Sequence, residues 1–186
     1  SNGCNGDYGR SEHDEPGAQS EHDERNGHGD RIKHGDRIEH AQLLRHEDIA
    51  RFAQLGIEAS VQPEHLLDDR EAIAKLWPGR AERAFPFASL LDNGARLHLG
   101  SDAPVAPLDP WRAIAAAVHR SLPGEPSWVP AERLTVEQAL SASMRGQLHP
   151  VAGDQADLIL LARDPLRMSH TELMQPTVCA TILGGM

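Results

Sequence analysis

Strand-forming and helix-forming segments alternate between residues 37 and 122, and this alternation restricts the possible folds more than any other feature of the chain. The strand-type segments are short and aliphatic, and the segments between them show helical spacing of apolar residues. Such alternation indicates parallel βα units, because a helix usually carries the chain back to the start of the next parallel strand. The sequence therefore predicts an α/β fold with three parallel strands in chain order, near residues 36–40, 57–62 and 96–101.

Capping signals locate the helices more closely. Gly56 supplies a C-terminal stop, and Asp109, which precedes a proline, is typical of an N-cap. Thr135 and Gln138 have the spacing of a capping box. The helices expected on these grounds are 45–56, 64–76, 80–92, 109–122 and 135–144, followed by strands at 156–162 and 177–183.

The N-terminal tract has a different composition from the rest of the chain. Residues 1–40 contain five apolar side chains against ten acids and five Lys or Arg. The tract is also repetitive: SEHDEPGAQ is followed by SEHDERNGH, and HGDRIKHGDRIEH at 28–40 contains Gly-Asp-Arg-Ile twice. Because so little apolar burial cannot offset the entropy of ordering the backbone, residues 1–36 are expected to be disordered.

Charge and cysteine content limit the partners and the compartment. The net charge of −10 argues against nucleic acid or an anionic membrane as a partner. Cys4 and Cys179 have no metal-type spacing and favour a reducing compartment, with a disulfide between them as the alternative. No apolar run approaches the roughly 18 residues of a membrane span, and no secretory signal is evident. A cytoplasmic location is therefore expected.

Two residues at predicted strand ends could carry chemistry. His40 ends the segment RIEH, and Asp102 ends LHLGSD. The carboxyl ends of parallel strands meet at one edge of a sheet, where reactive groups of α/β proteins gather. An imidazole nitrogen and a carboxylate at that edge can share a divalent metal ion. His98 lies within the third strand and is expected to be a core or interface histidine.

Several motifs extend over most of the chain in a recognisable order: RIEHAQLLRHEDIARFAQLGIEASVQPEHLLDD, LLDNGARLHLGSDAPVAPLDPWRAIAAAVHR, LTVEQAL and GDQADLILLARDPL. From about residue 37 the chain resembles the C-terminal half of metal-dependent amidohydrolases, in the branch that includes N-substituted formamide deformylase and related N-acyl hydrolases. The resemblance implies a partial (β/α)8 TIM barrel of about three βα units over 37–150. It also implies that 151–186 is a remnant of a small β-sandwich domain.

The resemblance also assigns roles to residues. It implies that His40 is a metal ligand, and that Asp102 is both a ligand and the general base. Gln62 and His65 fall on a segment near the active-site mouth and are expected to bind substrate. The implied cofactor is a divalent metal, with zinc as the expected ion.

The chain departs from the family pattern in its N-terminal part. No His-x-His occurs, although such enzymes begin with a strand that carries this motif. His28 and His34 resemble a strand-5 ligand only in part. His34 lies only six positions before His40, which is too short a distance for a crossover between neighbouring parallel strands. The repeats at 28–40 are interpreted as a duplicated remnant, and His34 is not expected to be a ligand.

Three functions remain open from the sequence. The first is hydrolysis of an amide or other non-peptide C–N bond in a small molecule by metal-activated water. The second is a truncated, non-catalytic fragment that associates with a partner, and the third is a His-rich module that sequesters metal. Because a partial barrel leaves open strand edges and uncovered apolar faces, self-association is also expected.

Overall fold

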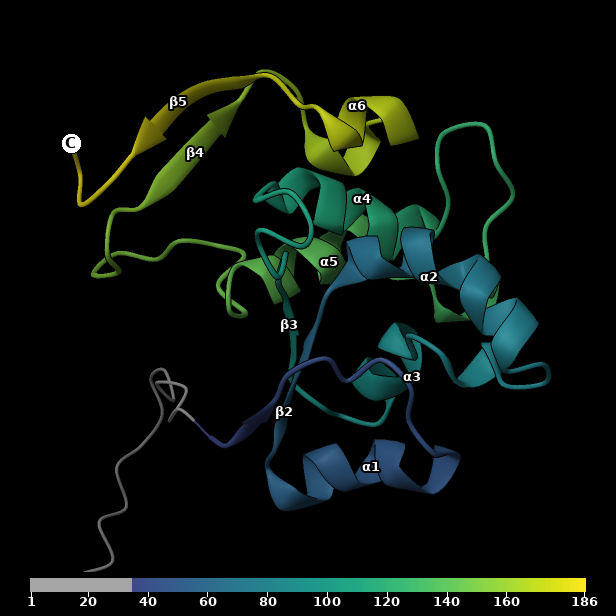
Figure 1. Cartoon of the computed structure of the whole chain (residues 1–186). Coiled ribbons are helices and arrows are strands. Elements are labelled where there is room, and N and C mark those ends of the chain that lie inside the picture. The colour runs from purple at the N-terminus through teal and green to yellow at the C-terminus, as the bar shows by residue number, and fades with distance from the viewer. Residues whose placement is uncertain (1–34) are drawn as a thin grey trace, which may run out of the picture. The chain divides into compact units, whose positions relative to one another are not determined.

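The computed structural model describes residues 35–186, whose main sheet consists of three parallel strands (Figure 1). The strands are β1 (Arg37–Ile38), β2 (Glu58–Val61) and β3 (Leu97–Leu99). They lie in the order β1-β2-β3, so the predicted chain order of three parallel strands is confirmed. The tract expected to be disordered, residues 1–36, lies almost entirely outside the described residues.

Six α-helices and three short 3-10 helices accompany the strands in this part of the chain. The α-helices are α1 (His46–Leu55), α2 (Pro63–Leu76), α3 (Phe87–Asp92), α4 (Pro110–His119), α5 (Val136–Ser143) and α6 (His170–Met174). The 3-10 helices are η1 (Ala81–Arg83), η2 (Pro130–Glu132) and η3 (Pro165–Arg167). None of the helices within residues 35–186 has both the length and the apolar character needed to cross a bilayer.

The predicted caps form as expected. Gly56 ends α1 with φ of 66°, a left-handed conformation that glycine adopts without a steric penalty. The Asp109 carboxylate caps α4 by accepting hydrogen bonds from two backbone N–H groups of the first turn. Thr135 and Gln138 form the reciprocal capping box at the start of α5. These contacts are local, which is why the sequence predicted them.

The helix expected over residues 80–92 is interrupted. It consists of η1 and α3, separated by a short segment in which Phe85 has φ of 54°. Pro86 explains the break, because a proline lacks the N–H of a continuous helix and disfavours helical backbone in the preceding residue. The single-helix prediction for this segment was therefore wrong.

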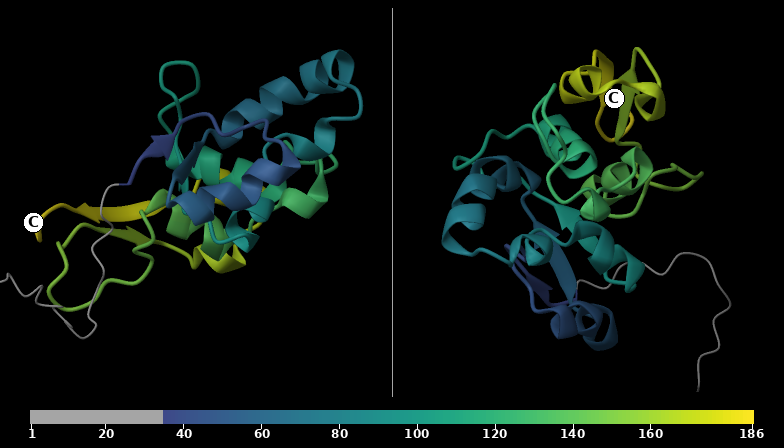
Figure 2. Two further views of the ribbon diagram at one scale, coloured as in Figure 1. Left: turned by 90° about the horizontal axis from the view of Figure 1, so that it is seen from below. Right: turned by 90° about the vertical axis from the view of Figure 1, so that its right-hand side faces the viewer.

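One face of the parallel sheet packs against the helices and forms the core. Ala59, Val61 and Leu97 point to this face and are buried. Helix α4, of which six residues are buried, contacts α2, α5 and α6 (Figures 1 and 2). The other face carries alternate residues, among them Ser60 and its partner His98 in the register. This second face is polar and leads to the candidate site.

Arg120 is a charged residue of the core, where it is fully buried at the end of α4. Its guanidinium donates to the carbonyl oxygens of Trp128 and Phe85 at 2.8 and 2.9 Å. It also lies over the Phe87 and Trp128 rings, 5.2 and 5.8 Å from their centroids. Burial lowers the pKa of Arg120 to about 10, so the group remains charged at neutral pH. Arg120 therefore ties two other segments of the chain, around Phe85 and around Trp128, to the end of α4.

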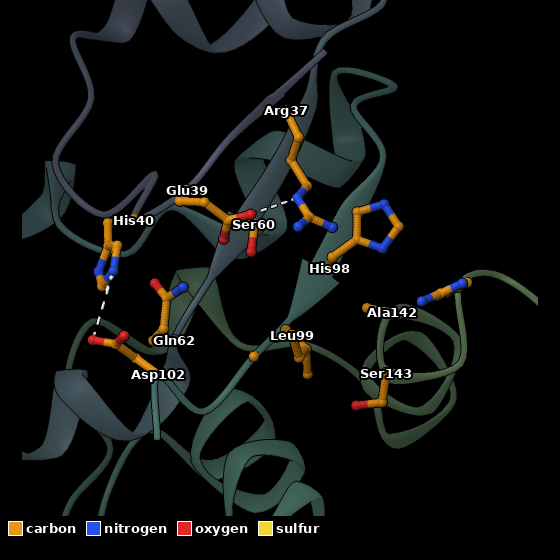
Figure 3. Close-up of a pocket in the computed structure, with 12 residues that line it drawn as sticks. Arg37, Glu39, His40, Ser60, Gln62, His98, Leu99, Asp102, Ala142 and Ser143 are labelled. Atoms are coloured by element: carbon orange, nitrogen blue, oxygen red, sulfur yellow. Dashed lines mark hydrogen bonds and ion pairs between the residues drawn. The ribbon is translucent and has the colours of Figure 1, made fainter. Parts of the chain in front are cut away.

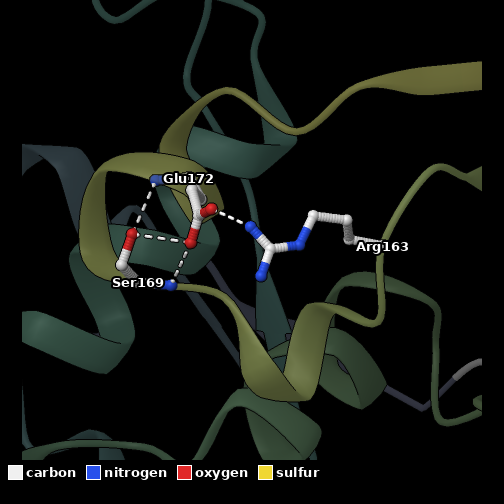
Figure 4. A network of polar contacts seen from close by, with 3 residues as sticks. All are labelled: Arg163, Ser169 and Glu172. Carbon is white, nitrogen blue, oxygen red and sulfur yellow. Dashed lines mark hydrogen bonds and ion pairs between the residues drawn. The ribbon is translucent and has the colours of Figure 1, made fainter.

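The C-terminal segment forms a separate antiparallel pair, β4 (Leu158–Leu161) and β5 (Val178–Ile182), called here the C-terminal ribbon (Figure 2). Both predicted strands are therefore present. Helix α6 lies between them in sequence and begins with a capping box of Ser169 and Glu172, whose carboxylate also pairs with Arg163 (Figure 4). Most residues of the ribbon are exposed, including the apolar Ile159 and Leu160.

Candidate metal centre

His40 and Asp102 lie together at the carboxyl edge of the parallel sheet, as their positions in the sequence predict. His40 follows β1, and Asp102 follows β3. The distance between His40 Nε2 and Asp102 Oδ2 is 3.6 Å (Figure 3). Both residues have left-handed backbone, with φ of 53° and 58°. Non-glycine residues seldom adopt this conformation, and it often marks a functional turn.

A third residue, His65, joins this pair from α2. The helix starts directly after β2, with Gln62 as its N-cap and a proline in its first turn, so His65 stands in the first turn at the sheet edge. Its Nε2 lies 3.8 Å from Asp102 Oδ2. Its ring stacks on that of His40, with centroids 5.6 Å apart and planes inclined by 23°. The family resemblance predicts that His65 binds substrate, and its position beside Asp102 also makes it a third candidate ligand.

The three side chains offer a donor set that fits a divalent metal ion. One ligand atom from each of His40, His65 and Asp102 lies within 4.8 Å of the others. Ligands about 2.1 Å from a tetrahedral zinc ion are about 3.4 Å from one another, close to the two observed distances. His65 Nε2 is buried and has no hydrogen-bond partner among the described residues. A buried polar atom without a partner is costly unless a ligand supplies one.

Two contacts hold His65 in place, one to its side chain and one to the residue before it. Gln42 Nε2 lies 3.3 Å from His65 Nδ1. Glu64, the neighbour of His65, is buried and accepts a hydrogen bond of 2.6 Å from Arg112 Nε in the first turn of α4. The start of α2 is therefore tied to α4, which fixes the backbone that carries the imidazole.

A cavity of about 440 Å³ on the polar face of the sheet is lined in part by His40 and Asp102 (Figure 3). Gln62 lines it; the residue is 4% exposed, and its Oε1 has no hydrogen-bond partner among the described residues. Arg37 and Glu39 line another side and form an ion pair of 2.5 Å. A side-chain hydrogen bond from Ser60, together with Arg37, lowers the pKa of Glu39. The cavity wall is thus rich in polar groups.

His98 also lines this cavity, a position that the sequence analysis did not assign to it. Its Nε2 lies 3.0 Å from Oε2 of the buried Glu58, an ion-pair distance that lacks hydrogen-bond geometry. Alternation along β3 is the signal in the sequence: it turns His98 to the face opposite the buried Leu97, where its register partner Ser60 also lines the cavity.

Comparison with known proteins identifies the family. A model of the amidohydrolase family matches residues 4–186. The chain belongs to the amidohydrolase family. The resemblance drawn from the sequence motifs is therefore confirmed.

Curated relatives of this amidohydrolase chain are considerably longer. This chain is 39% identical over 150 residues to Protein LONG AFTER FAR-RED 3 of Arabidopsis thaliana. The match covers 73% of this chain and 25% of that protein. It is 32% identical to the N-substituted formamide deformylase of Arthrobacter pascens, covering 73% of this chain and 27% of that protein. The chain thus spans about a quarter of the length of the curated relatives it matches.

Solved structures agree with this assignment. A crystal structure of an uncharacterized metal-dependent hydrolase from Pyrococcus horikoshii OT3 matches with a TM-score of 0.60 and 29% identity, covering 73% of this chain and 30% of that one. A second, from Pyrococcus furiosus, matches with a TM-score of 0.57 and 29% identity, covering 70% of this chain and 29% of that one. The α/β fold is therefore one that metal-dependent hydrolases also contain.

Proposed function

We propose that this chain carries a metal centre for hydrolysis of amide or other non-peptide C–N bonds in small molecules. The observation that supports it most strongly is the convergence of His40, His65 and Asp102, three residues from three separate segments. Membership of the amidohydrolase family supports the same reaction class. The three parallel βα units would then be part of a (β/α)8 barrel, and the C-terminal ribbon part of a small β-sandwich.

The donor set favours zinc among the divalent ions. Two imidazole nitrogens and one carboxylate are a common ligand set of catalytic zinc, which keeps a fourth position open. A divalent ion held there supplies a water of lowered pKa and polarises the carbonyl group of the substrate. The side chains of His40 and Asp102 are 45% and 36% exposed, so solvent and substrate can reach the centre.

Asp102 and Gln62 would have separate tasks in the reaction. The Asp102 carboxylate accepts a proton from the attacking water and returns it to the leaving nitrogen. The water oxygen first forms a C–O bond with the carbonyl carbon, and the C–N bond then breaks as the nitrogen takes up the proton, giving a carboxylic acid and an amine. Gln62 Oε1, buried in the cavity wall without a hydrogen-bond partner among the described residues, can accept the N–H of the substrate amide.

A non-catalytic role is the second candidate, and one observation favours it. The C-terminal ribbon exposes apolar side chains on both strands, among them Leu158, Ile159, Leu160 and Val178. A two-stranded ribbon is at best marginally stable in water without further cover. A chain that associates with a partner through this ribbon would bury that surface.

Metal analysis of the dialysed protein, residues 1–186, tests the proposed function. Wild type is expected to retain about one zinc ion per chain. Asp102→Asn should lose it, because the substitution removes the only anionic ligand of the set. A tail variant, with His13, His22, His28 and His34 all changed to Ala, should retain it. Loss of zinc from the tail variant, with retention in Asp102→Asn, would instead favour the metal-sequestering function.

Hydrolysis is assayed on the same proteins with added zinc. N-substituted formamides and N-acyl amines are the substrates to test first. Release of amine by wild type and by the tail variant, but not by Asp102→Asn, is the expected result. Equal release by wild type and Asp102→Asn would contradict the mechanism.

A further inference from the structure

Gln42 contacts the ring nitrogen of His65 that points away from the candidate metal centre. Its Nε2 lies 3.3 Å from His65 Nδ1 in a partly buried contact. Among the described residues, Gln42 is the one hydrogen-bond partner found for this imidazole. The other ring nitrogen, Nε2, faces Asp102 Oδ2 at 3.8 Å. The two nitrogens of His65 therefore face different groups.

The hydrogen bond at Nδ1 determines what Nε2 can do. A neutral imidazole carries one N–H and one lone pair, and its tautomer decides which nitrogen can bind a cation. If the Gln42 amide N–H donates to Nδ1, the proton of His65 is on Nε2 and points toward Asp102. If the carboxamide is reversed, its Oε1 accepts from Nδ1–H, and the Nε2 lone pair faces the centre.

The backbone holds Gln42 in this position. The Gln42 N–H donates to the carbonyl oxygen of His40 at 2.7 Å, and the Gln42 carbonyl accepts from the Phe85 N–H at 2.5 Å. The preceding residue, Ala41, is buried and donates its N–H to Ser60 O of β2. Gln42 is thus anchored next to one imidazole of the centre while its side chain contacts the other.

We propose that Gln42 is a positioning residue whose carboxamide sets the tautomer of the metal-free His65 and, by rotating to accept from Nδ1–H, holds Nε2 toward a divalent cation when one binds. The inference rests on the proposed function for the role of the cation. The selection of the tautomer itself concerns the metal-free protein. Without metal, the amide donates to Nδ1 and Nε2–H faces Asp102. With metal, the amide rotates, accepts from Nδ1–H and leaves Nε2 to the cation.

Three variants of the chain of residues 1–186 distinguish the two tautomers of His65. Gln42→Glu provides only an acceptor at pH 8 and should hold His65 as the Nδ1–H tautomer even without metal. Gln42→Met has a similar length but no hydrogen bond, so His65 should populate both tautomers. Gln54→Met, on an exposed position of α1, is the matched control. Circular dichroism checks that each variant is folded.

Two readouts follow the imidazole and the metal independently. Long-range ¹H–¹⁵N spectra of ¹⁵N-histidine-labelled, metal-free protein report the His65 tautomer, which should be Nε2–H in wild type and Nδ1–H in Gln42→Glu. Zinc titration should show affinity reduced about 10-fold to 100-fold in Gln42→Met, the usual cost of losing a group that orients a metal ligand. Gln42→Glu should bind zinc at least as tightly as wild type.

The outcomes distinguish this inference from the proposed function. An identical His65 tautomer in wild type and Gln42→Glu would overturn the inference, as would equal zinc affinity in wild type and Gln42→Met. If wild type does not bind zinc, the proposed function fails, and the tautomer spectra of the metal-free protein still decide the inference. If wild type binds zinc and the His65 tautomer is the same in every variant, the proposed function stands, and Gln42 has no positioning role.

Discussion

His65 Nε2 lies 3.8 Å from Asp102 Oδ2, across the carboxyl ends of two neighbouring parallel strands. This relationship turns a pair of candidate ligands into a set of three, because His40 lies beside the same carboxylate oxygen at 3.6 Å. Three protein ligands and one open position are the usual arrangement of catalytic zinc.

Asp102→Asn should reduce hydrolysis by more than about 100-fold, because it removes the proton acceptor while keeping the size of the side chain. Amine release under zinc-saturating conditions is the measurement. Asp109→Asn is a control, since Asp109 caps α4 with its side chain and an amide oxygen can still act as a cap. Similar losses in both variants would indicate a general structural effect.

His65→Ala and His40→Ala should each weaken zinc binding by more than about 100-fold, since losing a direct ligand should cost more than losing a supporting group. Competition titration against a zinc chelator gives the affinities. His34→Ala should have nearly no effect, because six residues are too few to place His34 and His40 on neighbouring parallel strands. Zinc binding that depends on His34 but not on His65 would refute the assignment of ligands.

The packing of α6 on α4 should weaken in acid. The His119 and His170 rings stack with centroids 3.9 Å apart. Burial, with the charges of His170 and Arg133, lowers the pKa of His119 to about 4, and burial also lowers that of His170. The unfolded chain, with a histidine pKa of about 6.5, therefore binds these protons first as the pH falls.

The free energy of unfolding should accordingly decrease between about pH 6.5 and pH 4, the window between the unfolded and folded pKa values of His119. His119→Phe keeps an aromatic ring on His170 but binds no proton. Urea denaturation at pH 7 and pH 4.5 should show a smaller pH dependence for this variant than for wild type. An equal dependence in both proteins would exclude His119 as a source of the effect.

Arg120→Met should destabilise the protein by about 3–5 kcal/mol, because it leaves buried carbonyl oxygens without a donor. Arg120→Lys keeps the charge but not the several donors of the guanidinium. Its free energy of unfolding should therefore lie between those of wild type and Arg120→Met. Chemical denaturation measures the free energy of unfolding of both variants. Arg45→Met, at an exposed position, should change the free energy of unfolding by less than about 0.5 kcal/mol.

The chain of residues 1–186 should self-associate through the C-terminal ribbon, where Ile159 and Leu160 are 55% and 61% exposed. Ile159→Lys and Leu160→Glu place charges on opposite faces of β4 and should each reduce association if both faces take part. Sedimentation velocity over a range of protein concentrations is the measurement. A salt-independent monomer of the wild-type chain would count against this surface.

Much of the architecture follows from signals between near neighbours in the sequence. The cap at Asp109 and the capping box at Thr135 depend on residues two or three positions away, and both form. The three parallel strands follow from alternation along the chain. Their order brings His40 and Asp102 to one edge, because the carboxyl ends of parallel strands coincide.

The sequence by itself therefore determined the α/β class, the three parallel strands and two of the candidate ligands. Only the tertiary structure shows that His65 is the third candidate ligand and that the side chain of Gln42 contacts its Nδ1. Both facts depend on contacts at the start of α2, where Leu66 is buried and the Glu64 carboxylate accepts a hydrogen bond from Arg112 of α4. Such contacts join segments far apart in the chain, so no local pattern can encode them.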